Sequence, residues 1–161
     1  MTTIPTNIQR FNDITLKLFE KLYRSFPEGI KVDGTDIGGE TVALDATFDD
    51  AFDTVILADY VIKWLGEEGF IRYEEYNQKG CYYGVRLTLR GLTILGYLPS
   101  SVTQGEKDEP LIEKIKQYVS SGAKMASGEV AKKIIGELFR LALSTTQQHS
   151  ASAILPTVLH I

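Results

Sequence analysis

The stretch that decides the fold is Gly69-Phe70-Ile71-Arg72-Tyr73-Glu74-Glu75-Tyr76, then Asn77-Gln78-Lys79-Gly80, then Tyr82-Tyr83-Gly84-Val85-Arg86-Leu87-Thr88-Leu89. Two runs rich in aromatic and β-branched residues flank a polar turn that ends in glycine, a pattern that predicts an antiparallel β-hairpin. In the second run Val85, Leu87 and Leu89 alternate with polar or charged residues. We therefore expect one face of this strand to be buried and the other to be exposed to solvent.

The residues before the hairpin are predicted to hold one long amphipathic helix and a glycine-rich stretch. Apolar residues recur at helical spacing from Asn7 to Phe26, and Pro27 follows, so the helix should end near Ser25. Residues 28–47 hold four glycines among short β-prone pieces, and we expect loops and short strands there. Residues 33–40 lack the ligand spacing of a calcium-binding loop and are assigned to turns.

A second helix is predicted from about Asp50 to Gly66, with Asp49 and Asp50 as its N-cap. The side expected to face the core carries Ala58, Val61, Ile62 and Leu65. The residues left on its outer side are Ile56, Asp59, Tyr60, Lys63 and Glu67. Because phosphate contacts need lysine and arginine, we expect this mixed and mostly acidic face to meet another protein rather than DNA.

Three further segments are predicted beyond the hairpin. A short helix from Gly91 to Leu98 closes the first domain, which spans residues 1–99, and the polar residues 100–110 form a linker. Residues 111–143 carry an apolar stripe at helical steps, which predicts one amphipathic helix, or two if Gly122 and Gly128 divide it. Residues 144–161 are expected to be a flexible tail.

The stripe in residues 111–143 has three possible roles. Its members include Ile112, Ile115, Val119, Ala126, Val130, Ile134 and Leu138. The stripe either folds back over the core of its own domain or joins two copies of the chain, and we weigh these two roles equally. Attachment to an anionic membrane surface through the flanking lysines ranks below both.

The order of helix, Gly69-Phe70-Ile71, hairpin and Val85–Gly91 resembles the second half of winged-helix domains in bacterial regulators. In that superfamily a helix ends in a Leu-x-x-x-Gly-hydrophobic-Ile pattern, and a β-wing runs into a Leu-Thr-x-x-Gly turn. The matching residues here are Leu65, Gly69, Phe70, Ile71, Leu87, Thr88 and Gly91. The resemblance covers about residues 49–99 and implies an α+β winged-helix-like domain with residues 7–26 as its first helix. That scaffold serves many functions, so it implies a fold rather than an activity.

The hairpin carries the main argument for nucleic-acid binding. The residues that would make a basic, aromatic wing for DNA include Arg72, Lys79, Tyr82, Arg86 and Arg90. Ordinary cross-strand tyrosine pairs, with glutamates offsetting the cations, explain the same residues without DNA, and we favour that interpretation. The net charge of −4 points the same way, because it repels nucleic acid at long range.

No catalytic, cofactor or metal constellation stands out in the sequence. The two histidines, His149 and His160, lie in the expected tail, and no phosphate-loop motif is present. The lone Cys81 fits a reducing cytoplasm, and a redox-sensing thiol is weighed there against an incidental one. We therefore expect a non-enzymatic cytoplasmic module that binds another protein or itself, without cofactor or metal. A DNA-binding regulator is the alternative, and peripheral membrane association is a further one.

Overall fold

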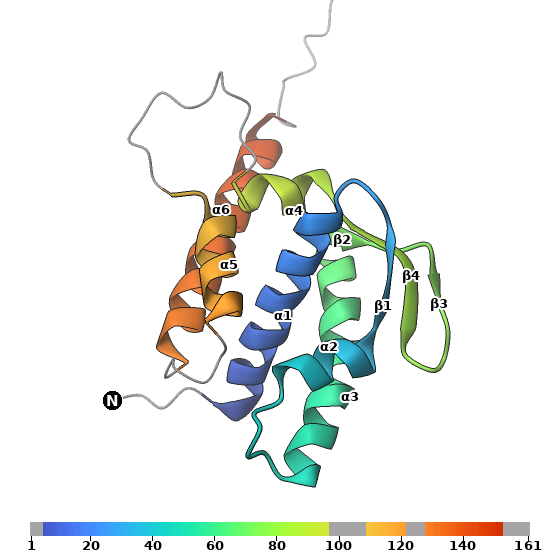
Figure 1. Ribbon diagram of the computed structural model, residues 1–161. Coiled ribbons are helices and arrows are strands. Elements are labelled where there is room, and N and C mark those ends of the chain that lie inside the picture. The colour runs from blue at the N-terminus through green and yellow to red at the C-terminus, as the bar shows by residue number, and fades with distance from the viewer. Residues whose placement is uncertain (1–4, 97–108, 122–127, 153–161) are drawn as a thin grey trace, which may run out of the picture.

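The computed structural model describes residues 5–96, 109–121 and 128–152, with only the backbone described for 145–152. In chain order its elements are α1 (Thr6–Ser25), β1 (Ile30–Asp33), α2 (Gly34–Thr41), α3 (Phe48–Glu67), β2 (Ile71–Arg72), β3 (Glu75–Tyr76), β4 (Cys81–Leu87), α4 (Leu89–Ile94), α5 (Leu111–Ser120) and α6 (Glu129–Ser152). These helices and one small antiparallel sheet confirm the expected α+β class (Figure 1).

The strand β4 is the centre of the sheet. It pairs with β1 on one side and with β2 and β3 on the other, always antiparallel. The predicted hairpin is thus confirmed, and the Asn77 side chain closes its turn by accepting from the backbone N–H groups of Lys79 and Cys81. Leu89 was predicted to lie on the buried face with Val85 and Leu87, but it does not. It is 77% exposed, because the chain has left the strand and begun α4.

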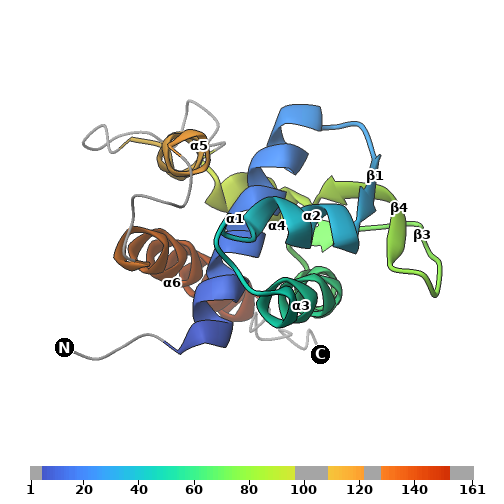
Figure 2. The ribbon, with the colours of Figure 1, turned by 60° about the horizontal axis from the view of Figure 1, so that its bottom comes forward.

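The helix α1 lies in the middle of the molecule. Figures 1 and 2 show α5 and α6 on one side of it and α2, α3 and the sheet on the other. Its core residues Ile14, Leu18, Phe19 and Leu22 are fully buried. The predicted bounds of this helix agree with the structure, which ends it at Ser25.

The glycine-rich stretch contains a helix that the sequence did not suggest. Residues 33–40 were expected to form turns, but α2 occupies Gly34–Thr41, so that expectation is wrong. Asp33 caps the helix by accepting from the backbone N–H of Thr35 at 2.8 Å. Ile37 anchors the helix in the core, and the missing side chain of Gly38 lets its backbone approach α3 closely.

The helix α3 begins slightly earlier than predicted. Its N-cap is Thr47, whose hydroxyl accepts from the N–H of Asp50, rather than Asp49 or Asp50. The two aspartates lie in the first turn instead, where their charge still faces the positive end of the helix dipole. The predicted core-facing residues of this helix are all buried, as expected.

A tight junction joins β4 to the end of α3. Thr88 caps α4 by accepting from the N–H of Gly91, and its hydroxyl also donates to the Gly69 carbonyl at 2.6 Å. Gly91 leaves no room for a side chain, because a Cβ there would lie 2.2 Å from the Phe70 carbonyl oxygen. The short helix was expected over residues 91–98, but it occupies Leu89–Ile94.

The C-terminal segment forms two helices packed on α1. The expected division is confirmed, since α5 ends at Ser120 and Gly128 precedes α6 with a positive φ of 57°. The flexible tail predicted from Ser144 is wrong for residues 144–152, because α6 continues to Ser152. Most of the predicted linker and residues 153–161 lie outside the described part of the chain.

A hydrogen bond between two side chains joins α5 to α1. The Tyr118 hydroxyl donates to Asp13 Oδ1 at 2.5 Å. Burial raises the pKa of Asp13 above its ordinary value of 3.8, and the bond from Tyr118 offsets part of that rise. A raised pKa in the folded state means that Asp13 destabilises the fold increasingly as pH rises through that pKa.

Removing this hydrogen bond should therefore weaken the fold in a pH-dependent way. We expect Tyr118→Phe to lower the free energy of unfolding by about 2 kcal/mol at pH 7, because the buried carboxyl group loses its donor. Below the ordinary pKa of 3.8, Asp13 is protonated in both states and the loss should shrink. Urea denaturation at both pH values measures this, with Tyr83→Phe, 38% exposed on β4 and outside α3, as control. A loss independent of pH would contradict the assignment.

Candidate interaction surface

One face of α3 carries a row of uncovered apolar side chains. They recur at every fourth residue and are Phe48, Phe52, Ile56, Tyr60 and Trp64, exposed by 82, 57, 44, 65 and 36% respectively. We call this row the α3 ridge. Residues four apart lie along one line of a helix surface, so the ridge is continuous and separate from the buried side of α3.

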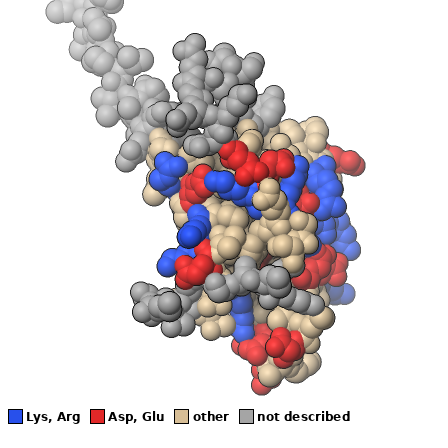
Figure 3. Space-filling model, turned by 60° about the vertical axis from the view of Figure 1, so that its left-hand side comes forward, with Lys and Arg blue, Asp and Glu red and all other residues tan. Residues whose placement is uncertain are grey.

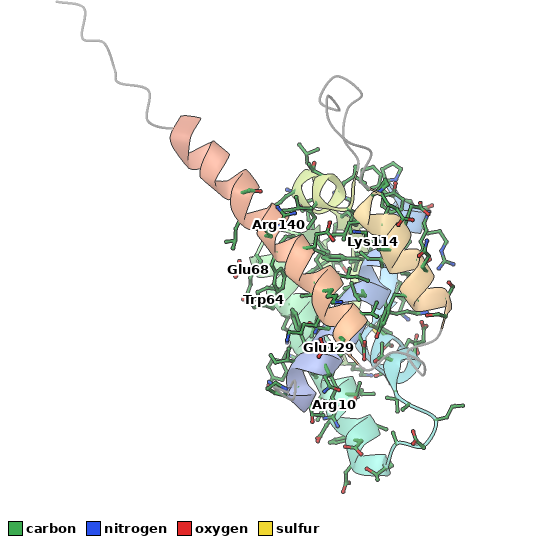
Figure 4. The ribbon with its side chains drawn as sticks, turned by 90° about the vertical axis from the view of Figure 1, so that its left-hand side faces the viewer. Arg10, Trp64, Glu68, Lys114, Glu129 and Arg140 are labelled. Carbon is green, nitrogen blue, oxygen red and sulfur yellow. The ribbon has the colours of Figure 1, made fainter. Side chains whose placement is uncertain are left out.

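The two ends of the ridge differ in how they are held. At its start, the rings of Phe48 and Phe52 stack on each other with centroids 6.3 Å apart. At its end, Trp64 packs edge-on against Phe11 at 5.4 Å and against Phe139 of α6 at 6.0 Å. Figure 4 shows Trp64 beside α6. The ridge therefore starts at the edge of the molecule and ends on its aromatic core.

Acidic side chains border the start of the ridge. Figure 3 shows them gathered at the lower end of the molecule, where α3 begins. Arg10 of α1 reaches two of them, with its guanidinium 2.7 Å from Asp50 and 3.8 Å from Asp53. The Thr47 hydroxyl and then Arg10 hold the pKa of Asp50 below its usual range. Asp49 has no ion pair within the described chain.

Two of the predicted contact residues on α3 are engaged inside the molecule. The carboxylate of Asp59 accepts from Tyr82 at 2.5 Å and lies 2.8 Å from the Lys63 ammonium. That ammonium also lies 4.6 Å from the centre of the Tyr76 ring. The network fastens α3 to the hairpin and neutralises the charge beside the middle of the ridge. The other predicted contacts, Ile56, Tyr60 and Glu67, are exposed.

The predicted basic wing is only partly assembled. Tyr82 as a wing contact is wrong, because its side chain is fully buried and its hydroxyl is bonded to Asp59. Arg86 pairs with Glu74 at 3.2 Å, and the Arg90 guanidinium lies over the Phe70 ring at 4.5 Å. Arg72 and Lys79 are exposed.

The tyrosines of the hairpin pack against one another. Tyr76 and Tyr82 are cross-strand partners with ring centroids 4.7 Å apart, and the Tyr73 ring packs edge-on against Tyr82 at 4.9 Å. This is the arrangement expected of a small sheet without DNA.

The predicted self-association stripe is mostly covered by its own chain. Ile112, Ile115, Ile134 and Leu138 are buried in the core between α1, α5 and α6, so these four are not a free surface. Val119 is half-buried, and Val130 is 46% exposed. Ala126 lies outside the described residues. The buried members of this stripe thus face the chain's own core. Among the described residues, no helix is long and apolar enough to cross a membrane.

The surroundings of the Cys81 thiol do not favour a redox-sensing role. Its thiol donates to the Asp33 carboxylate at 3.1 Å, and this bond to a negative group raises the pKa of the thiol. A raised pKa disfavours the reactive thiolate, which supports the incidental interpretation of Cys81 over the redox-sensing one. The same bond lowers the pKa of Asp33. Within the described ranges, no three His, Cys, Asp or Glu side chains converge as a metal site would need.

No protein-family model, curated protein or solved structure matches the chain.

Sequence reasoning found only the middle of the ridge, Ile56 and Tyr60. It missed Phe48, Phe52 and Trp64, although large apolar residues at strict four-residue spacing were a readable signal.

Proposed function

We propose that this protein is a non-catalytic interaction module of winged-helix-like architecture, which binds protein through the α3 ridge. The element order supports that architecture: three helices with β1 after the first, then β2 and a hairpin, and an outward-facing third helix. The motif residues Thr88 and Gly91 act at the junction between hairpin and helix, as the resemblance implies.

The observation that carries this proposal is the exposure of five large apolar side chains in one row. Soluble monomers seldom expose a contiguous apolar patch larger than a few hundred Å², and larger patches mark interaction sites. Aromatic residues are also the ones enriched where proteins bind each other. The ridge is therefore better suited to a protein partner than to solvent.

The charge of α3 disfavours the DNA alternative. A helix that enters the major groove passes between phosphates and needs cations on its outer side. The outer and flanking side chains of α3 include one lysine, already paired with Asp59, and several carboxylates. The exposed cations Arg72 and Lys79 of the hairpin are separated in the sequence by two exposed glutamates, Glu74 and Glu75, which offset their charge.

Site-specific photo-crosslinking tests the proposal. A photoreactive phenylalanine analogue at Phe52 should form a covalent protein adduct, because that position lies in the ridge. The same analogue at Lys132, exposed on α6, is the control and should form none. Adding Ile56→Asp should abolish the adduct at position 52. If position 52 yields no protein adduct, or none that depends on Ile56, the proposal fails.

Duplex DNA provides the opposing test. We expect no retardation of a labelled duplex of about 30 base pairs at about 50 mM salt, given the repulsion described above. Binding that weakens with rising salt and is lost in Arg72→Ala/Lys79→Ala would overturn the proposal in favour of a DNA-binding wing.

A further inference from the structure

We infer that the occupant of the α3 ridge is a second copy of this chain, bound through the same ridge about a twofold axis near Ile56. This inference rests on the proposed function and names its partner. It makes α3 the dimer interface, in place of the C-terminal stripe that the chain buries in its own core.

The shape of the ridge fits a copy of itself. A row of side chains at four-residue spacing packs into the groove beside the same row of another helix, which gives the commonest helix crossing, near −50°. A twofold axis brings identical rows together without any further complementary surface. With Ile56 on the axis, Phe52 of one copy faces Tyr60 of the other. The ridge is symmetric about its centre in this sense, with two large side chains on each side of Ile56.

The charges beside the ridge permit this pairing. Near the crossing point, Asp53 is close to Arg10, and Asp59 is paired with Lys63 and bonded to Tyr82. No unpaired carboxylate of the described chain therefore lies against the twofold axis. Asp49 lies farther out, and antiparallel pairing centred on Ile56 places it toward Lys63 of the second copy. Like-charge repulsion thus does not oppose self-association, although the whole chain is acidic.

The exposed area is large enough for a weak dimer. Large apolar side chains of this kind present about 150–250 Å² each, so the exposed fractions of the ridge correspond to on the order of 500 Å² per copy. Complete coverage of the ridge would bury at most about 1,000 Å² in total, which is the lower edge of specific interfaces. We therefore expect a dissociation constant on the order of 10 μM.

The surroundings of α3 leave room for another molecule. In Figures 1 and 2 the first half of α3 lies at the margin of the molecule, away from α5 and α6. Phe48 and Phe52, at this free end, are two of the three most exposed side chains of the ridge.

Sedimentation velocity on the full chain tests the inference. Between about 1 and 200 μM, the weight-average mass should rise from 17.9 kDa toward twice that value. Ile56→Asp places two carboxylates against each other on the axis and should weaken dimerisation at least about 100-fold. Val130→Asp is the matched control, since Val130 on α6 is 46% exposed against 44% for Ile56, and it should leave the dissociation constant unchanged.

A cysteine scan tests the position of the axis without depending on the folding of the Asp variant. Ile56→Cys should form a disulfide-linked dimer under mild oxidation, because a residue on a twofold axis meets itself. Phe48→Cys, two helical turns away, should not, and the unmodified chain controls for Cys81. Disulfide formation at position 48 but not at 56 would overturn the proposed arrangement.

The outcomes separate this inference from the proposed function. A chain that stays monomeric up to 200 μM and gives no dimer from Ile56→Cys overturns self-pairing. If crosslinking at position 52 then joins a different protein, the ridge still binds protein and only the identity of the occupant was wrong. If it joins none, both proposals fail.

Discussion

Gly91→Ala should lower the free energy of unfolding by about 3 kcal/mol, the largest loss we expect from one methyl group in this chain. A Cβ at position 91 would lie 2.2 Å from the Phe70 carbonyl oxygen, far inside contact distance. That oxygen cannot easily move, because it accepts from the backbone N–H of Thr88 at 3.1 Å. The modest gain in helix propensity from alanine is too small to offset such a clash.

Urea denaturation of purified variants measures this effect. Gly136→Ala is the control, since Gly136 lies in α6 with nothing within 4 Å of the position of its Cβ. It should raise the free energy of unfolding by up to about 1 kcal/mol. Equal effects of the two substitutions would show that helix propensity, and not the contact with Phe70, decides the outcome at position 91.

Elements with strong periodic patterns were predictable from the sequence. The spacing of apolar residues located α1 to within a residue or two at each end, because half of its surface must be buried against other elements. The alternation from Val85 to Leu87 identified β4 for the same reason. It misled at Leu89, where local alternation continues but Thr88 has already capped a helix. Capping by a side chain is a competing local preference that alternation alone does not reveal.

The helix α2 was not predictable because its stability comes from packing rather than propensity. Three of its eight residues are glycines, which disfavour helix in isolation. The structure offsets that cost by burying Ile37 and by placing α2 directly against α3. A pattern of single residues carries little information on such a contact between neighbouring helices.

The sequence predicted an exposed face on α3 but not how far the row of exposed apolar residues extends along the helix. Its sequence has apolar residues on two sides, and periodicity cannot say which side the rest of the chain will cover. Charge was also misleading, because Asp59 and Lys63 appeared as a polar face and prove to be tied to the hairpin. Asp50 is neutralised by Arg10, whereas Asp49 has no ion pair in the described chain. Only the tertiary arrangement reveals this difference between two adjacent aspartates.

Alanine at each of the two adjacent glycines of α2, Gly38 and Gly39, should change the free energy of unfolding in opposite directions. A Cβ on Gly38 would lie 2.8 Å from the Val55 Cα and 3.1 Å from the Thr54 carbonyl, so α2 would have to move away from α3. Both obstacles are backbone atoms, which have no alternative rotamer. We expect Gly38→Ala to lower the free energy of unfolding by about 2–3 kcal/mol.

Gly39→Ala provides a control one residue away in the same helix. Gly39 is exposed and has nothing within 4 Å of the position of its Cβ, so alanine should raise the free energy of unfolding by about 0.5–1 kcal/mol. Urea denaturation of both variants tests whether the free energy of unfolding falls for Gly38→Ala and rises for Gly39→Ala. A shift of α2 would also displace the start of α3, so Gly38→Ala should weaken dimerisation in sedimentation, whereas Gly39→Ala should not. Stabilisation by both substitutions would mean that α2 does not pack against α3 as closely as the structure has it.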